Sequence, residues 1–165
     1  GTGTLARPVA DADVLFPIGI SSYNPIILNN DGGNAVFYEA RVRDELLEDG
    51  MSGAQVGEYA VNRTWEVNEE TAGGSNLEVT PHWSRAEEVG YTGSDFVVAN
   101  YDNGMWESVG SGATNSSLGL KSLSGTTNNL GEFAIFEDRS PLTDSYICND
   151  NGALMVNGTI STTEN

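Results

Sequence analysis

Short runs of alternating apolar and polar residues, separated by turn-forming residues, constrain the fold of this chain most strongly. In the clearest run, from Val36 to Val42, the even positions are apolar and the odd positions include Glu39 and Arg41. Successive side chains of a β-strand point to opposite faces of the sheet. The run therefore predicts a strand with one buried and one solvated face.

Similar runs recur along the chain, with Gly, Asn, Ser and Thr between them. They cover 60–67, 77–83, 95–101, 104–109, 116–123 and 130–136, and a further strand is expected from Ala153 to Ile160. Asn103-Gly104 joins two of the runs and is a strong signal for a two-residue hairpin turn. Strands at a spacing of roughly 8–12 residues predict an all-β, antiparallel sandwich of immunoglobulin-like or jelly-roll type with extra terminal strands.

Proline and helix signals refine this prediction. Pro8 and Pro17 lie in strand-like runs, which confines those runs to sheet edges or bulges. Ser84 to Glu88 predicts one helical turn, with Ser84 as N-cap and Glu87 completing a capping box. The segment 43–49 is expected to coil briefly before two glycines stop it.

The charge of the chain narrows its partners. A formal net charge of -17 over 165 residues repels phosphate backbones, so nucleic acid is excluded as a partner and anionic membranes are disfavoured. No run reaches the roughly 20 apolar residues that a membrane helix requires, so no membrane insertion is expected. The acidity fits solubility at high ionic strength, divalent-cation binding, or repulsion between crowded surface proteins.

Residues that carry catalysis are scarce, so the sequence predicts that the protein is not an enzyme. Cys148 and His82 are the only cysteine and histidine, which excludes an intrachain disulfide and a four-ligand site of Cys and His for zinc. A Ser-His-Asp triad would depend on His82, which lies at the end of an alternating run where a packed histidine is expected. Glutamate pairs are numerous, but in so acidic a chain they arise by chance.

Oxygen-rich turns offer weak candidates for calcium, and no other cofactor is expected. Asp31, Asp102 and Asp150 each lie among Asn and Gly residues and supply the hard ligands that calcium prefers. None has EF-hand spacing, and Asn-Asp-Gly stretches are also ordinary turn chemistry. Both interpretations stay open at the level of sequence.

Tryptophans raise the question of glycan binding. Trp65 and Trp83 fall on the apolar phase of their strands and are predicted to pack in the core. Trp106 follows the Asn103-Gly104 turn, and we consider it the candidate contact for surface glycans.

Several segments together resemble a known domain. They are Gly1 to Val9, Leu15-Phe-Pro-Ile-Gly19, Tyr23-Asn-Pro25, Val61-Asn-Arg-Thr-Trp65, Thr71 to Ser75, and His82-Trp83. In this order they resemble a β-sandwich domain of large cell-surface and secreted Bacteroidota proteins, which often precedes a type IX secretion sorting signal or recurs in adhesins. The resemblance covers approximately Gly1 to Glu137 and implies an extracellular, cell-surface location. No sorting signal is visible after it, which suggests a repeat or part of a longer polypeptide.

The sequence thus predicts a β-sandwich domain at 1–140 and a C-terminal strand extension at 141–165. Both ends are expected to pair with neighbouring copies or repeats, each donating an edge strand to the next. The assembly residues are Leu5, Val9, Leu154, Val156 and Ile160. The predicted function is a non-catalytic structural or adhesive module of a surface fibre, and the alternative is a carbohydrate-binding module of a secreted multidomain protein.

Overall fold

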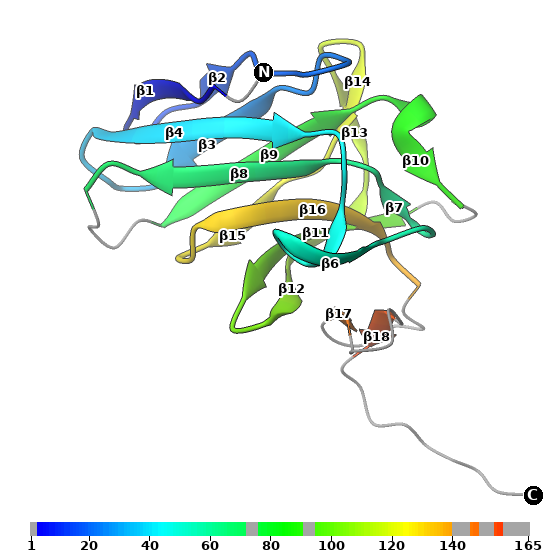
Figure 1. The fold of residues 1–165 in the computed structure, drawn as a ribbon. Coiled ribbons are helices and arrows are strands. Elements are labelled where there is room, and N and C mark those ends of the chain that lie inside the picture. The colour runs from blue at the N-terminus through cyan, green and yellow to red at the C-terminus, as the bar shows by residue number, and fades with distance from the viewer. Residues whose placement is uncertain (1–2, 72–75, 91–94, 140–145, 149–153, 157–165) are drawn as a thin grey trace, which may run out of the picture.

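A computed structural model describes residues 3–71, 76–90, 95–139, 146–148 and 154–156, and shows two antiparallel sheets packed face to face (Figure 1). The prediction of an all-β sandwich is confirmed. The only helical element among the described residues is a single 3-10 turn, η1 (Arg85–Glu87). No described helix is long and apolar enough to cross a membrane.

The larger sheet has the strand order β1-β4-β8-β16-β11-β12, and β7 pairs with both β10 and β16. Its strands are β1 (Leu5–Val9), β4 (Val36–Arg43), β7 (Ala60–Val61), β8 (Thr64–Glu69), β10 (Glu88–Val89), β11 (Asp95–Asp102), β12 (Met105–Ala113) and β16 (Gly131–Glu137). Every pair is antiparallel, and the N-terminal strand β1 ends the order.

The smaller sheet has the order β13-β14-β9-β3-β2, and β15 pairs with β9 beyond the end of β14. Its strands are β2 (Val14–Phe16), β3 (Ile26–Asn30), β9 (Leu77–Trp83), β13 (Asn115–Ser117), β14 (Leu120–Ser122) and β15 (Gly125–Thr127). Two separate hairpins complete the fold. They are β5 (Leu47–Asp49) with β6 (Ser52–Gln55), and β17 (Tyr146–Cys148) with β18 (Leu154–Val156).

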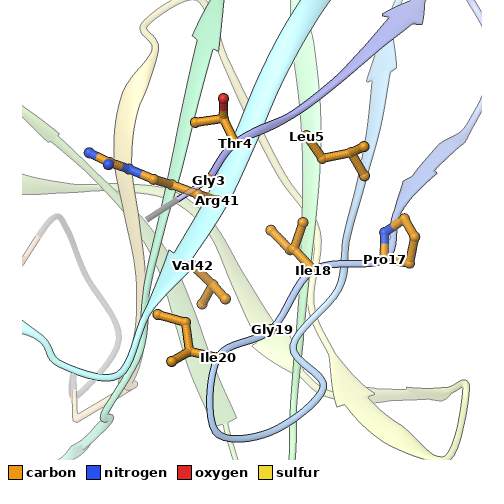
Figure 2. Close-up of a pocket in the computed structure, with 9 residues that line it drawn as sticks. All are labelled: Gly3, Thr4, Leu5, Pro17, Ile18, Gly19, Ile20, Arg41 and Val42. Atoms are coloured by element: carbon orange, nitrogen blue, oxygen red, sulfur yellow. The ribbon is translucent and has the colours of Figure 1, made fainter. Parts of the chain in front are cut away.

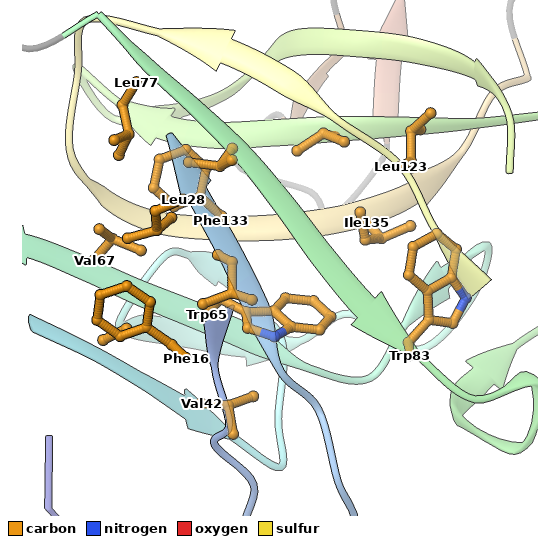
Figure 3. Close-up of a cluster of buried hydrophobic side chains, with 14 of the residues drawn as sticks. Phe16, Leu28, Val42, Trp65, Val67, Leu77, Trp83, Leu123, Phe133 and Ile135 are labelled. Carbon is orange, nitrogen blue, oxygen red and sulfur yellow. The ribbon is translucent and has the colours of Figure 1, made fainter. Parts of the chain in front are cut away.

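The main core fills the space between the sheets (Figure 3). Trp65 and Trp83 lie in it without any exposed surface, as their strand phase predicted. Trp83 contacts Phe96 edge to face, with ring centroids 5.2 Å apart. These residues come from β8, β9 and β11, so the tryptophans tie the two sheets together.

A second core lies on the outer face of the larger sheet. Its buried residues are Leu46, Ala60, Val97, Ala99, Trp106, Ala134 and Phe136. The β5–β6 hairpin lies over this face, in front of β11 and β16 in Figure 1. The expectation of a brief coil at 43–49 is therefore wrong: Leu46 and the hairpin behind it cover apolar side chains that would otherwise face water.

Proline positions follow from hydrogen bonding. Pro8 lies in β1, an edge strand, which confirms its prediction, and Pro17 directly follows β2 at the edge of the smaller sheet. Pro81 lies inside β9, which continues through it to Trp83. The His82 N–H donates to the Pro25 carbonyl at 2.9 Å, on the side of β9 that faces β3. The backbone nitrogen of Pro81 therefore faces the other side of β9, where the pairings with β15 and β14 leave a gap. No ladder donor is needed there.

The turns are partly as predicted. Asn103 and Gly104 both have positive φ and join β11 to β12, which confirms the hairpin. The run 116–123 is not one strand, because the chain reverses at Leu118 and Gly119 and forms the β13–β14 hairpin. The Ser84 N–H donates to Glu87 Oε2 at 2.8 Å at the start of η1, as the capping prediction required.

One edge of the sandwich is closed. Gly110 of β12 lies so near β15 that a Cβ there would be 2.3 Å from the Ser124 carbonyl oxygen. Only glycine permits this approach between the two sheets. At the opposite edge, Arg7 of β1 donates a hydrogen bond to the Leu15 carbonyl of β2 at 2.9 Å, which links the two sheets.

Candidate functional site

A pocket of about 350 Å³ lies beside the start of β1. It is lined by Gly3, Thr4, Leu5, Pro17, Ile18, Gly19, Ile20, Arg41 and Val42. Figure 2 shows Ile18 between Leu5 and Val42, with Ile20 at the rim and the Arg41 side chain extending outward. Its lining combines the apolar side chains of Leu5, Ile18, Ile20 and Val42 with the polar side chains of Thr4 and Arg41, so the pocket can accept one apolar side chain beside polar groups.

The backbone edge of β1 borders the pocket. β1 pairs with β4 from Leu5↔Ala40 to Val9↔Val36, and no described strand pairs with its other side. Proline in an edge strand stands where its missing N–H would face solvent. Pro8 therefore limits pairing with an added strand to the Leu5 end of β1, which is the end beside the pocket.

The other wall of the pocket is a tight loop, residues 17–23. Gly19 and Tyr23 form an isolated antiparallel bridge. A Cβ on Gly19 would lie 2.1 Å from the Ser22 carbonyl oxygen, so this turn accepts no residue other than glycine at position 19. The loop leaves Ile20 and Tyr23 45% and 47% exposed, which is unusual for large apolar side chains on a loop this constrained.

A buried polar network holds this loop from below. Arg63 and Glu87 form an ion pair at 3.0 Å, and both residues are only 8% exposed. Glu87 accepts hydrogen bonds from the Ser22 hydroxyl and from Asn24 Nδ2, the latter at 2.7 Å. Arg63 donates to Asn24 Oδ1 at 3.1 Å and to the Ser21 hydroxyl at 3.2 Å. The charged groups are satisfied within the protein, so we interpret the network as a support for the loop.

The charge around the pocket differs from that of the rest of the chain. Three of the seven cationic residues, Arg7, Arg41 and Arg43, lie on β1 and β4. Arg41 and Arg43 pair with Glu66 of β8. Counted with Glu39 and Glu66, this group has a net charge of +1, against -17 for the whole chain. The β1–β4 edge is therefore the better place for an acidic segment to dock.

The predicted assembly residues fall in different places. Leu5 lines the pocket, whereas Val9 is fully buried and serves the core. Leu154 and Val156 are the ends of β18, which pairs with β17 of the same chain. Ile160 lies outside the described residues. In Figure 1 the β17–β18 hairpin and β1 lie at opposite ends of the molecule.

Trp106 is not a glycan contact in this structure. It has no exposed surface, its Nε1 donates to the Leu47 carbonyl at 3.2 Å, and its ring contacts Tyr101 and Phe136 edge to face. The prediction failed because β5–β6 covers the outer face from which Trp106 projects. No local pattern revealed that this face was covered.

The calcium candidates do not converge. Asp31 accepts a hydrogen bond from Asn76 Nδ2 at 3.3 Å, and Asp102 accepts from Asn103 and Asn129 at 2.9 and 3.0 Å. Asp150 lies outside the described residues. Within the described residues, no three His, Cys, Asp or Glu side chains gather as a metal site would require. Both described aspartates accept hydrogen bonds from asparagine side chains.

His82 is fully buried, and its Nδ1 lies 2.9 Å from the Thr80 carbonyl oxygen. Its Nε2 has no hydrogen-bond partner among the described residues. Burial lowers the pKa of His82 below its ordinary value, although backbone hydrogen bonds with Thr80 and Pro25 oppose this shift. His82 thus contributes a packed, neutral ring.

Sequence reasoning missed the loop network and the pocket. Arg63, Glu87 and Asn24 are far apart in sequence and look like ordinary surface residues. The one available signal was the Pro17-Ile18-Gly19 stretch, where glycine punctuates an apolar run. Comparison with protein-family models, with curated proteins and with solved structures gave no match.

Proposed function

We propose that the protein is a non-catalytic structural or adhesive module of an extracellular cell-surface assembly, joined to neighbouring copies through its terminal strands. The observation that carries this proposal is the outer edge of β1, with which no described strand pairs, and the pocket beside it. A strand added to such an edge gains main-chain hydrogen bonds, and a side-chain pocket gives it specificity. The resemblance to Bacteroidota surface domains supports the extracellular setting.

The proposal that no reaction is catalysed rests on the chemistry of the described residues. His82, the only histidine, is buried and its pKa is lowered by burial, and the buried Arg63–Glu87 pair is satisfied internally. The carbohydrate-binding alternative has lost its named contact, because Trp106 is buried. We therefore do not carry that alternative forward.

The acidity of the chain sets the conditions for assembly. Copies with a net charge of -17 repel one another at low ionic strength, and salt screens this repulsion at separations beyond the Debye length, which is about 10 Å at 0.1 M. Assembly should therefore be weak at low salt and strengthen as salt is added.

Deleting residues 152–165 tests the proposal. Electron microscopy and light scattering of the intact chain at about 0.5 M salt should show filaments or large oligomers, and the truncated chain should stay monomeric. Unimpaired filaments from the truncation would rule out the C-terminal strand as a joint. An intact chain that stays monomeric at every salt concentration would overturn the proposed function.

A further inference from the structure

We propose that the pocket at the start of β1 receives residues 157–165 of a second copy, with Ile160 seated among Leu5, Ile18 and Val42. This inference rests on the proposed function and identifies both halves of the joint. The donor segment pairs with the outer side of β1, and its one large apolar residue fills the pocket.

The composition of residues 157–165 fits this role. Ile160 is the only large apolar residue in this segment, and Thr159, Thr162 and Thr163 beside it are of a residue type that favours strands. In an extended segment, alternate side chains point to the same face. Ile160 would then enter the pocket while Thr159 and Ser161 stay in water. Because Pro8 has no N–H to donate to an added strand, pairing is confined to the end of β1 nearest the pocket. This also restricts the register of the added strand.

Charge complementarity favours this orientation of two copies, while the repulsion between whole chains still governs how assembly depends on salt. The donor segment 157–165 contains Glu164 and no Lys or Arg, which gives it a net charge of -1, and the whole extension 141–165 has a net charge of -3. The group around the pocket has a net charge of +1. If the β1–β4 edges of two copies met each other, arginines would face arginines. If this edge instead meets the acidic extension of another copy, opposite charges face each other.

The position of the two ends determines what such a joint builds. β1 and the β17–β18 hairpin lie at opposite ends of the molecule (Figure 1). A contact between two different surfaces of identical subunits is heterologous, and it produces open chains unless the rotation closes a ring. The joint therefore extends copies head to tail.

Disulfide trapping tests this placement. All variants carry Cys148→Ser, which removes the native thiol. One full-length variant adds Thr4→Cys at the pocket rim, a second adds Ile160→Cys, and a matched control adds Met51→Cys, which is also exposed at a turn away from β1. Under mild oxidation in assembling conditions, the Thr4→Cys and Ile160→Cys pair should yield at least tenfold more mixed dimer than Met51→Cys with Ile160→Cys.

Equal yields from the two mixtures, while the chains assemble, would overturn this inference and leave the proposed function standing. A second measurement covers chains that do not assemble. A fluorescent synthetic peptide of residues 154–165 should bind the full-length protein at least tenfold more tightly than the same peptide with Ile160→Asp. Binding of both peptides with equal affinity, or of neither, would also overturn the inference.

Discussion

Trp106 shows how much a single side chain depends on distant parts of the chain. Its position after the Asn103-Gly104 turn was predicted correctly, but its burial was not, because the covering hairpin comes from residues 47–55. Trp65 and Trp83 were predicted correctly because strand alternation alone assigns them to the inner face. Alternation indicates which face a residue occupies but not whether another element covers that face.

Removing Trp106 should therefore damage stability. Trp106→Ala is expected to lower the free energy of unfolding by about 3–5 kcal/mol, since it empties the second core. Phe37→Ala is the matched control, because Phe37 is 48% exposed and should cost less than about 1 kcal/mol. Urea denaturation followed by fluorescence measures both. Similar losses for the two variants would contradict the account of the second core.

His82 makes the free energy of unfolding depend on pH. Because burial lowers its pKa in the folded state, the unfolded chain binds the proton more readily. Its contribution to stability is complete above the unfolded pKa of about 6.5 and declines as the pH falls below that value. His82→Gln should flatten the fall in unfolding free energy between pH 6.5 and pH 5. An unchanged slope would show that His82 is not the responsible group.

The loop network should behave as a unit. Glu87→Gln leaves the buried Arg63 with Asp44, 3.4 Å away, as its remaining charged partner and is expected to cost about 3 kcal/mol. Chemical denaturation of Glu87→Gln, Arg63→Met and the double variant should show strong non-additivity, with the double variant costing less than the sum of the singles. Additive losses would mean that the two residues do not support the loop together.

Individual elements were predictable where a short-range signal decides them. The Asn103-Gly104 hairpin and the Ser84 turn were predicted from adjacent residues and are confirmed. The β13–β14 hairpin was missed, because Leu118 occupies a left-handed position (φ 56) that leucine rarely adopts. The β5–β6 hairpin was missed because its Leu-Leu-Glu-Asp sequence favours a helix locally, and packing on the outer face overrides that preference.

The strained turn at Leu118 makes a prediction at the scale of its hairpin. Leu118 is 54% exposed, so its side chain contributes little packing. Leu118→Asn would create an Asn-Gly turn like the one between β11 and β12. It should raise the free energy of unfolding by about 1 kcal/mol, which thermal unfolding can detect. A loss of stability would indicate that Leu118 makes contacts that favour leucine.

At the scale of the whole molecule, the sandwich was predictable and the pocket at its edge was not. Alternation and turn spacing lead to two sheets, but the pocket depends on how the loop at 17–23 meets β1 and β4. The excess of acid was plain in the sequence. The fold shows in addition where this acidic chain carries positive charge, namely at the arginines on β1 and β4.

The central claim is that copies of this module join through their ends. Sedimentation velocity of the intact 17.5 kDa chain across a series of salt concentrations tests it most directly. The account predicts a monomer at low salt and a broad distribution of fast-sedimenting species at high salt, which deletion of residues 152–165 abolishes. A single species of monomer mass at every salt concentration would contradict it.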